Sequence, residues 1–390
     1  MSSRRWLVIT SSFPRHEGDV AGHFVERWCR ALVDRGHEID VLCWRGGGIE
    51  NRDLGPGLRV RFVPYAWRDA ESLFFGAGAP ENLSEVPTRA LLAVPAVAAM
   101  VTAALQACAH SDYDGVVGHW LVPGGGIARI VGAATGLSAR VVGHSAGVHL
   151  LRRLPSPVGR RLASWICGAP VTVPTSVLRE YLVRIAGGAD IRVAPMGYET
   201  APESVCASSH CAGQGLQLGF VGRLVPIKGL GRVIEAIKRL RTQGLDIRLD
   251  VLGDGPSREQ WEGQSGEGVR FLGATFGDKK WEKMASWDAF VMPSKINADG
   301  RHEGLPVSLL EASSVGAVPL VSGVPGVDHW LANPRRQRLQ GGVEQWCEAL
   351  GWVDGLRPKQ MANLRRETRH KVQQLAWREY APWWEDWMGS

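Results

Sequence analysis

The stretch Leu216–Gly229, with the sequence LQLGFVGRLVPIKG, predicts how the second half of this chain folds. Its first six residues are mostly apolar, which favours a buried strand, and a turn with glycine and proline follows at once. Apolar side chains then recur at helical spacing, so we expect a helix over Gly229–Arg241. Strand, turn and helix in this order are typical of the start of a doubly wound α/β domain.

The same alternation of strand and helix continues on both sides of this stretch. Strands are expected at Trp6–Ser11, Glu38–Trp44, Leu58–Val63, Asp114–Gly118, Ala139–His144, Val171–Pro174, Ile191–Ala194, Ile247–Leu252, Val269–Leu272, Asp288–Met292 and Ala317–Val321. Strands that alternate with helices form parallel sheets. The fold class is therefore α/β, with two Rossmann-like, doubly wound domains that face each other across a cleft.

The predicted boundaries follow changes in composition. We expect an N-terminal domain over 1–200, a small and polar linker over 201–215 and a C-terminal domain over 216–372. The Trp-rich segment 373–390 is expected to form a helix that covers apolar surface, and packing back on the N-terminal domain is one option.

Composition excludes several classes of protein. The chain has 390 residues, 45% of them hydrophobic, and a formal net charge of +6, so it is not disordered and carries no nucleic-acid-binding tail. Seven cysteines without a C-x-x-C pair favour neither a disulfide framework nor a zinc site, although Cys206, His210 and Cys211 form a weak metal candidate. The start of the chain resembles a strand more than a signal peptide, and the prediction is a cytoplasmic protein.

Two positive side chains flank the turn that follows the strand Leu216–Val221. Arg223 and Lys228 stand where open α/β sheets bind ligands, and backbone N–H groups at a helix start favour an anion. No lysine precedes Lys228 in the chain. The turn therefore predicts a clamp for a diphosphate, and the alternative is a solvated turn with two surface bases.

A second candidate is Glu303–Glu311, with the sequence EGLPVSLLE. Gly304 permits close approach of the backbone, and Pro306 suits the first turn of a helix. Glu311 lies inside this apolar helix, where a carboxylate usually has a hydroxyl or cationic partner. The two carboxylates are interpreted as a grip on sugar hydroxyls, and an internal ion pair of Glu311 is the alternative.

These motifs and their order resemble the family 4 retaining glycosyltransferases of the GT-B fold. FVGRLVPIKG is similar to the phosphate-binding turn of that family and EGLPVSLLE to its E-x7-E motif, with VLGDGP, VRFLG and FVMPS between them. In the first half, FPRHEGDVAG resembles the glycine loop after the first strand. The segments VVGHWLVPGG, VVGHSAGVHLL and VAPMGYE also look like family landmarks.

The resemblance implies a role for each matching residue. Arg223 and Lys228 would hold the donor diphosphate, assisted by the backbone of Gly304, Leu305 and Pro306, and Gly22 would let the first loop approach the phosphates. Glu311 would bind the ribose. Glu303 would bind the donor sugar and His144 would lie beside it, and these two are the catalytic candidates. His119 would belong to the acceptor side or to a structural shell around the site. The alternative is a histidine without a functional role, whose hydrogen bonds are satisfied at the end of its strand.

Two positions depart from the family pattern. Ala21 precedes Gly22 where paired glycines are frequent, and Gly326-Val327-Asp328-His329 stands where a glycine pair and a glutamate are usual. These departures suggest a second hypothesis, a catalytically silent protein that binds a nucleotide-sugar or assists an assembly. A nicotinamide-dependent dehydrogenase is disfavoured because no glycine fingerprint follows the first strand.

The resemblance also implies the reaction and its partners. We expect a nucleotide-sugar donor, UDP- or GDP-linked, transfer with retention, no protein nucleophile, no cofactor and no metal. The acceptor would be a glycan, a lipid-linked or a natural-product molecule.

Membrane contact is a separate prediction. The arginines of His149–Ile166 could lie on the inner face of a membrane, the alternative being solvated surface turns. The uncharged stretch Ala90–Ala109 is interpreted as a helix buried against a sheet, because its alanines and polar residues suit a membrane span poorly.

Overall fold

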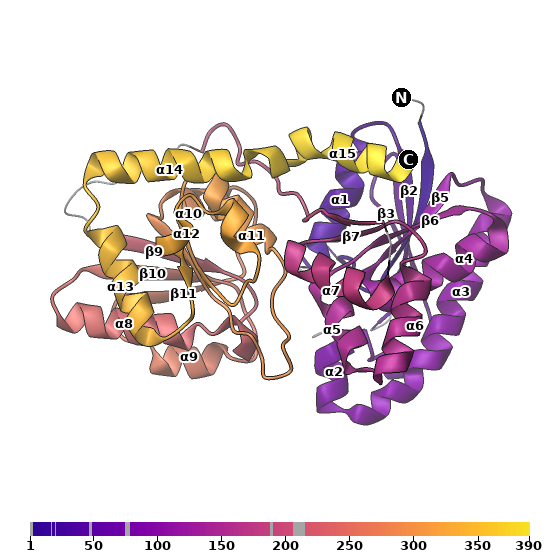
Figure 1. Ribbon diagram of the computed structural model, residues 1–390, viewed down its shortest axis with the longest axis horizontal. Coiled ribbons are helices and arrows are strands. Elements are labelled where there is room, and N and C mark those ends of the chain that lie inside the picture. The colour runs from indigo at the N-terminus through magenta and orange to yellow at the C-terminus, as the bar shows by residue number, and fades with distance from the viewer. Residues whose placement is uncertain are drawn as a thin grey trace. The chain divides into compact units, whose positions relative to one another are not determined.

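The computed structural model describes residues 3–16, 18–19, 21–46, 49–74, 79–187, 190–205 and 215–390, and the chain divides into two compact units. Unit 1 comprises Met1–Pro195 together with Ala381–Ser390, and unit 2 comprises Met196–Tyr380. Figure 1 shows the elements of both units. Within the predicted linker 201–215, residues 206–214 lie outside the described residues, and so does the metal candidate of Cys206, His210 and Cys211.

Unit 1 contains an eight-stranded sheet with the order β3-β4-β2-β1-β5-β6-β7-β8. Its strands are β1 (Arg5–Thr10), β2 (Glu38–Trp44), β3 (Arg52–Asp53), β4 (Leu58–Val63), β5 (Gly115–His119), β6 (Ser138–Val142), β7 (Val171–Val173) and β8 (Ile191–Val193). Neighbouring strands are parallel except β3 and β4. The order reverses between β1 and β5, so the carboxyl ends of these two strands mark a switch point for ligands.

Helices connect the strands of unit 1. They are α1 (His23–Val33), α2 (Ala79–Glu85), α3 (Ala93–His110), α4 (Gly126–Thr135), α5 (Ser145–Arg153), α6 (Ser156–Ile166) and α7 (Ser176–Ala186). Short helical turns are η1 (Arg68–Ala70), η2 (Pro87–Leu92) and η3 (Trp120–Gly125). Fully buried apolar residues of the strands, such as Leu7 and Ile9 of β1, form the core against these helices.

Unit 2 contains a six-stranded sheet with the order β11-β10-β9-β12-β13-β14, and all its pairs are parallel. The strands are β9 (Leu216–Val221), β10 (Ile247–Leu252), β11 (Val269–Gly273), β12 (Ala289–Pro293), β13 (Val318–Ser322) and β14 (Arg338–Leu339). This is the strand order 3-2-1-4-5-6 of dinucleotide-binding sheets, with the switch point between β9 and β12. The expected α/β architecture with two parallel sheets is confirmed.

The helices of unit 2 end in a segment shared with unit 1. They are α8 (Gly231–Thr242), α9 (Arg258–Gln264), α10 (Gly277–Ala285), α11 (Val307–Ser314), α12 (Pro334–Gln337), α13 (Val343–Asp354) and α14 (Pro358–Val372), with turns η4 (Pro226–Lys228), η5 (Val327–Trp330) and η6 (Gln373–Leu375). The last helix is α15 (Trp377–Gly389), and its residues from Ala381 onward belong to unit 1. There the Trp384 ring lies 5.8 Å from the Trp28 ring of α1, and Glu385 pairs with Arg35 and His37.

Helix α3 departs from its prediction as a buried helix. Ala96, Met100, Ala103 and Ala104 are buried against the sheet, and the Trp44 indole donates a hydrogen bond to the Ala96 carbonyl at 2.8 Å. Only 22% of the most apolar 18-residue window of Pro87–His110 is buried, however, and this segment is long and apolar enough to cross a membrane. An alanine-rich helix has little polar contrast between its sides, so the sequence did not reveal that much of this helix is only half-buried or exposed.

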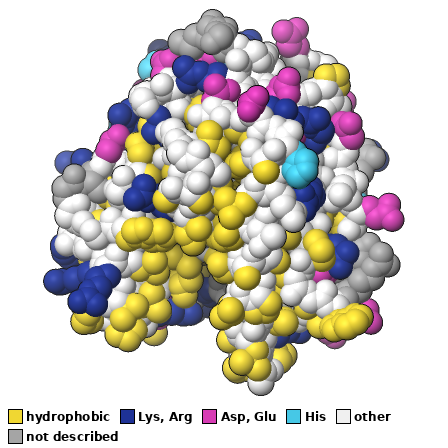
Figure 2. All heavy atoms as spheres, turned by 90° about the vertical axis from the view of Figure 1, so that its right-hand side faces the viewer, with side chains coloured by type: hydrophobic (Ala, Val, Ile, Leu, Met, Phe, Trp, Pro, Cys, Tyr) yellow, Lys and Arg dark blue, Asp and Glu magenta, His cyan; other side chains and the backbone are white. Residues whose placement is uncertain are grey.

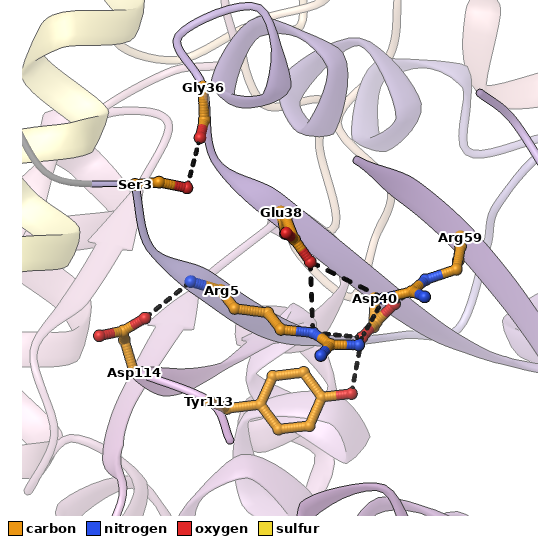
Figure 3. Close-up of polar contacts among 8 residues, drawn as sticks. All are labelled: Ser3, Arg5, Gly36, Glu38, Asp40, Arg59, Tyr113 and Asp114. Atoms are coloured by element: carbon orange, nitrogen blue, oxygen red, sulfur yellow. Dashed lines mark hydrogen bonds and ion pairs between the residues drawn. The ribbon is translucent and has the colours of Figure 1, made fainter. Parts of the chain in front are cut away.

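The amino ends of β1 and β2 carry an ion-pair network (Figure 3). The Asp40 carboxylate accepts hydrogen bonds from Arg5 and Tyr113, both at 2.7 Å, and from Arg59 at 2.9 Å. Burial by itself would raise the pKa of the Asp40 carboxyl. The hydrogen bonds from Tyr113, Arg5 and Arg59 together outweigh this effect, so the pKa lies below its ordinary value. The network lies at the opposite end of the strands from the switch point, and we interpret it as structural.

Candidate functional site

The turn after β9 is held by backbone contacts on two sides. Gly222 N–H donates to the Leu252 carbonyl at 3.0 Å, and Leu224 N–H donates to the Asp254 carbonyl at 2.8 Å, which joins this turn to the one after β10. On the other side, Lys295 N–H donates to the Ile227 carbonyl at 2.7 Å. The predicted anion-binding turn is therefore a fixed part of the switch point of unit 2.

Gly229 allows this close packing. Its φ of 63° lies in the left-handed region, and a Cβ at this position would collide with the Pro293 carbonyl at the end of β12. The turn that precedes α8 thus lies directly against the strand that precedes the Glu303 loop. Only glycine satisfies both the conformation and the contact.

Lys228 and Glu303 meet at this switch point. The Lys228 Nζ lies 3.2 Å from the Glu303 Oε1, and both side chains are largely buried. Arg223 is exposed on the same turn, five residues earlier in the chain. Two residues predicted from separate motifs are therefore brought into one site by the fold.

Glu311 lies inside α11 and is 8% exposed. Its Oε1 accepts a hydrogen bond from the Lys280 Nζ at 2.7 Å. Lys280 comes from α10 and also lies over the Trp281 ring, 4.8 Å from its centroid. The ion pair that the sequence left open as an alternative therefore exists, and its lysine was missed because it stands 31 residues away in sequence.

The segment between the two glutamates leads into α11. Leu305 is buried, Gly304 is half-buried and Pro306 is the N-cap residue. Pro306 has no backbone N–H, so it can shape the helix start but cannot donate to an anion, which corrects that part of the expected set. Gly304, Leu305 and the first residues of α11 are the candidate donors.

The segment Gly326-Val327-Asp328-His329 after β13, which departs from the family pattern, has an ordinary local structure. Gly326 has a φ of 82° and caps η5, Asp328 pairs with Arg338 at 3.1 Å, and the exposed His329 ring lies 4.8 Å from Trp330. The Asp328 carboxylate is thus engaged with an arginine beside β14. At the position where the family pattern has a glutamate, the nearby carboxylate of this chain therefore forms an ion pair with Arg338.

Gly22 lies between β1 and α1 of unit 1, as Gly229 lies between β9 and α8 of unit 2. It is the N-cap residue of α1 with a φ of 69°, and a Cβ on it would collide with the backbone of Ser12 and Phe13 after β1. Ala21 N–H donates to the Asp19 carboxylate at 2.9 Å. The glycine therefore brings the start of α1 against the end of β1, at the switch point of this sheet.

His119 and His144 form a pair at the same edge. His119 ends β5 and His144 follows β6, and the His119 Nδ1 lies 3.2 Å from the His144 Nε2. The rings are stacked with an interplanar angle of 19°. Among the described residues, the His119 Nε2 is buried and has no hydrogen-bond partner. The strand-end position of both residues agrees with their prediction, while their direct contact was not expected.

Burial keeps this pair uncharged. It lowers the pKa of His144 to about 3, and burial together with the neighbouring His144 holds the pKa of His119 well below its usual value. Neutral imidazoles each carry one N–H and one acceptor nitrogen. The pair can therefore donate and accept hydrogen bonds without presenting charge.

Two aromatic side chains that sequence reasoning did not assign surround His144. The Phe24 ring lies 5.1 Å and the Trp120 ring 4.6 Å from the His144 ring. Trp120 follows β5 with a φ of 64°, which is a strained conformation for a bulky residue and is typical of functional sites. Phe24 lies in the first turn of α1, so this helix brings an aromatic ring onto the histidine.

Both halves of the chain match families of known proteins. Residues 21–198 match the family described as "Glycosyl transferase 4-like domain", and residues 215–355 match "Glycosyl transferases group 1". The fold is also that of a sucrose-phosphate synthase from Thermosynechococcus elongatus, with a TM-score of 0.74 and 17% identity over 98% of each chain. Two parallel α/β domains with these matches define a protein of the GT-B fold.

Curated relatives agree with this assignment. The amylovoran biosynthesis glycosyltransferase AmsK of Erwinia amylovora is 35% identical over 30% of this chain and 32% of its own length. The chain thus spans about a third of that relative. A GDP-mannose-dependent alpha-(1-6)-phosphatidylinositol monomannoside mannosyltransferase of Mycolicibacterium smegmatis is 27% identical over 93% of this chain and 99% of the relative. The chain belongs to the GT4-type glycosyltransferases of the GT-B fold.

Proposed function

We propose that this protein transfers a sugar from a nucleotide-diphosphate sugar to a glycan, lipid-linked or natural-product acceptor, with retention of the anomeric configuration. The observation that carries the proposal is the contact of Lys228 with Glu303 at the switch point of unit 2. It joins a cation suited to a diphosphate to a carboxylate suited to sugar hydroxyls. Family membership supports the same reaction class.

The charge of Lys228 would act on the leaving group. As the bond between sugar and diphosphate breaks, negative charge develops on the diphosphate, and fixed donors that face it stabilise the transition state more than the ground state. The backbone bonds on both sides of the turn hold it in place before substrate arrives. Arg223 on the same turn would add a second cation.

The remaining site residues would orient the donor. Glu303 would accept hydrogen bonds from the sugar, and Glu311 would bind the ribose while Lys280 holds its carboxylate in place. In unit 1, the uncharged His144 would present its imidazole beside the sugar, with His119 fixing its ring. No residue is assigned as a nucleophile, and the acceptor would attack on the face that the diphosphate leaves.

We further propose that Arg223 and Lys228 supply the positive charge that a divalent cation would otherwise provide. The test is transfer in the presence of excess chelator. Unchanged turnover is the expected result, and a loss that Mg²⁺ or Mn²⁺ restores would overturn this part of the proposal.

A GDP- or UDP-linked donor is proposed. Support for GDP comes from the mannosyltransferase of Mycolicibacterium smegmatis, whose name states dependence on GDP-mannose and action on a phosphatidylinositol mannoside. The same relative supports a lipid-linked acceptor, whereas the amylovoran relative supports polysaccharide synthesis. A thermal-shift panel of nucleotide-sugars would rank the donors directly.

The decisive experiment measures release of nucleoside diphosphate from a panel of nucleotide-sugars in the presence of a lipid and glycan fraction. Lys228→Ala and Glu311→Gln should each strongly lower release, because they remove the diphosphate contact and the ribose contact. Lys238→Ala and Glu367→Gln are matched controls, since both side chains are exposed on helices of the same unit. Wild-type release by both site variants would refute the site assignment.

A catalytically silent protein is the second candidate. It is favoured by the position after β13, where Asp328 is paired with Arg338 and the usual glutamate is absent. Such a protein would bind a nucleotide-sugar tightly, and binding would still depend on Lys228, but no diphosphate would be released with any acceptor. Turnover in the panel above excludes this candidate.

A further inference from the structure

An exposed apolar surface covers one side of unit 1. Leu91 of η2 is 80% exposed and Val94 of α3 is 78% exposed, both far above the exposure of a core residue. Ile130 of α4 and Val158 and Trp165 of α6 are also exposed. Figure 2 shows the hydrophobic side chains of this side gathered into one broad area. Large contiguous apolar patches mark sites of interaction with a partner or a membrane.

The three helices form a continuous surface. Helix α3 packs beside α4, and Arg129 of α4 donates to the Trp165 carbonyl of α6 at 3.2 Å. The same guanidinium lies 6.0 Å from the centroid of the Trp165 ring. We call the side chains of Leu91, Val94, Ile130, Val158 and Trp165, with Arg129, Arg160 and Arg161, the apolar–arginine face.

The charged side chains of this face are all arginines, and Glu85 of α2, which pairs with Arg89 of η2 at 3.8 Å, lies beside it. Helices α3, α4, α5 and α6 contain no Asp or Glu, and between Pro87 and Arg179 the only acidic residues are Asp112 and Asp114. Those two precede β5 at the amino end of the sheet, where Asp114 accepts a hydrogen bond from the Arg5 backbone. Arg160 and Arg161 are exposed on α6, and in Figure 2 Lys and Arg side chains border the apolar area together with some Asp and Glu side chains.

We propose that the apolar–arginine face docks unit 1 on the surface of an anionic lipid bilayer. Exposed apolar side chains would enter the boundary between headgroups and acyl chains, while the arginines bind lipid phosphates. The interaction needs neither donor nor acceptor, so it is independent of the proposed transfer reaction.

The packing of α3 distinguishes lying on the bilayer from spanning it. Its buried residues and the hydrogen bond from Trp44 hold one face of the helix on the sheet. Insertion across the bilayer would remove that face from the core, whereas docking leaves every one of these contacts in place. A second copy of the chain is disfavoured because pairing this face with itself would bring two sets of arginines together.

Vesicle sedimentation tests the proposal on the full chain. Phosphatidylcholine vesicles containing phosphatidylglycerol should retain the protein, pure phosphatidylcholine vesicles should retain it at least tenfold less, and rising salt should release it. The double variants Arg160→Ser with Arg161→Ser and Leu91→Asp with Val94→Asp should each weaken partitioning about tenfold or more. The two variants separate the electrostatic and the apolar contribution.

Matched controls lie in unit 2. Arg335→Ser with Arg336→Ser removes another exposed arginine pair, and Leu272→Asp adds charge at another exposed leucine. Both should partition like the wild type, and melting curves would confirm that all variants fold. Partitioning that is equal on both vesicle types, or unchanged in both face variants, would overturn the proposal, as would concentration-dependent dimers that the Leu91→Asp and Val94→Asp variant abolishes.

Discussion

The two sheets place different chemistry at the same topological position. In unit 2, the switch point between β9 and β12 holds the charged pair of Lys228 and Glu303. In unit 1, the switch point between β1 and β5 holds the stacked, uncharged pair of His119 and His144. The same kind of switch point therefore carries a charged pair in one unit and an uncharged pair in the other.

The residues that follow each strand explain this difference. After β9 the chain supplies two cations on a turn that backbone hydrogen bonds fix. After β5 and β6 it supplies two histidines that contact the rings of Phe24, Trp28 and Trp120, and burial lowers the pKa of both imidazoles. If the proposed roles hold, unit 2 supplies the charged contacts to the donor, and unit 1 supplies uncharged hydrogen-bonding groups.

The largest expected effect comes from removing the charge of unit 2. Lys228→Ala should lower turnover about 100- to 1,000-fold, since it removes a donor to the developing charge, and affinity for the free nucleoside diphosphate about 10- to 100-fold. His144→Ala should lower turnover but leave diphosphate affinity within about twofold, because this ring is uncharged and its proposed place is beside the sugar and not the diphosphate. Calorimetric titration with UDP and GDP measures both variants.

A large loss of diphosphate affinity in His144→Ala would contradict the division of roles. Lys238→Ala, on an exposed part of α8, is the control for general loss of positive charge.

Glycine substitutions compare how rigidly the two switch points are built. Gly22→Ala and Gly229→Ala each force a Cβ into backbone at a left-handed φ. We expect the free energy of unfolding to fall by about 1–2 kcal/mol from the conformation and by a further ~1–3 kcal/mol from the collision. Chemical denaturation measures the sum.

Gly136→Ala isolates the conformational part. Gly136 has a φ of 78° and no atom within 4 Å of a Cβ built on it. Equal destabilisation by Gly22→Ala and Gly136→Ala would show that the backbone of Ser12 and Phe13 can move away from the new Cβ without a measurable loss of stability.

The pair in unit 1 should make stability depend on pH. His144 has a pKa of about 3 in the folded protein, against about 6.5 in an unfolded chain. Between these values the unfolded state binds more protons, so the free energy of unfolding falls as the pH is lowered from 6.5. The slope reaches at most about 1.4 kcal/mol per pH unit for each histidine. His144→Gln should reduce this slope between pH 6.5 and 5.

His110→Gln is the matched control because His110 is exposed at the end of α3. An unchanged slope in His144→Gln would mean that this imidazole is hydrated and that unit 1 does not hold a neutral site.

Much of this comparison could be predicted from the sequence. The expected strands Glu38–Trp44, Leu58–Val63, Leu216–Val221 and Ile247–Leu252 have those bounds in the structure, because short apolar runs end at clear turns. Lys228 and Glu303 could be named because each lies in a motif beside a helix start. Their contact could not be, since it depends on how β9 and β12 pair.

Other features lack any local signal in the sequence. Lys280 lies in a charged segment that resembles an ordinary exposed helix, and only the packing of α10 against α11 makes it a partner of Glu311. The exposed side of α3 is hidden for the opposite reason, because every face of that helix is apolar. Patterns of polarity fail where a segment is uniformly charged or uniformly apolar.

The smallest expected effect concerns Lys280, which acts through Glu311. If it positions that carboxylate for ribose, Lys280→Met should raise the KM for the donor about 3- to 10-fold, equivalent to about 1 kcal/mol, with little change in kcat. Lys280→Arg should restore most of the affinity, and Lys279→Met, at the exposed neighbouring lysine, should have no effect. A merely structural ion pair would instead lower the melting temperature and leave KM unchanged. That outcome would confine recognition in unit 2 to Arg223, Lys228 and Glu303, and the contrast with the histidine pair would then rest on the turn after β9 and the glutamate beside it.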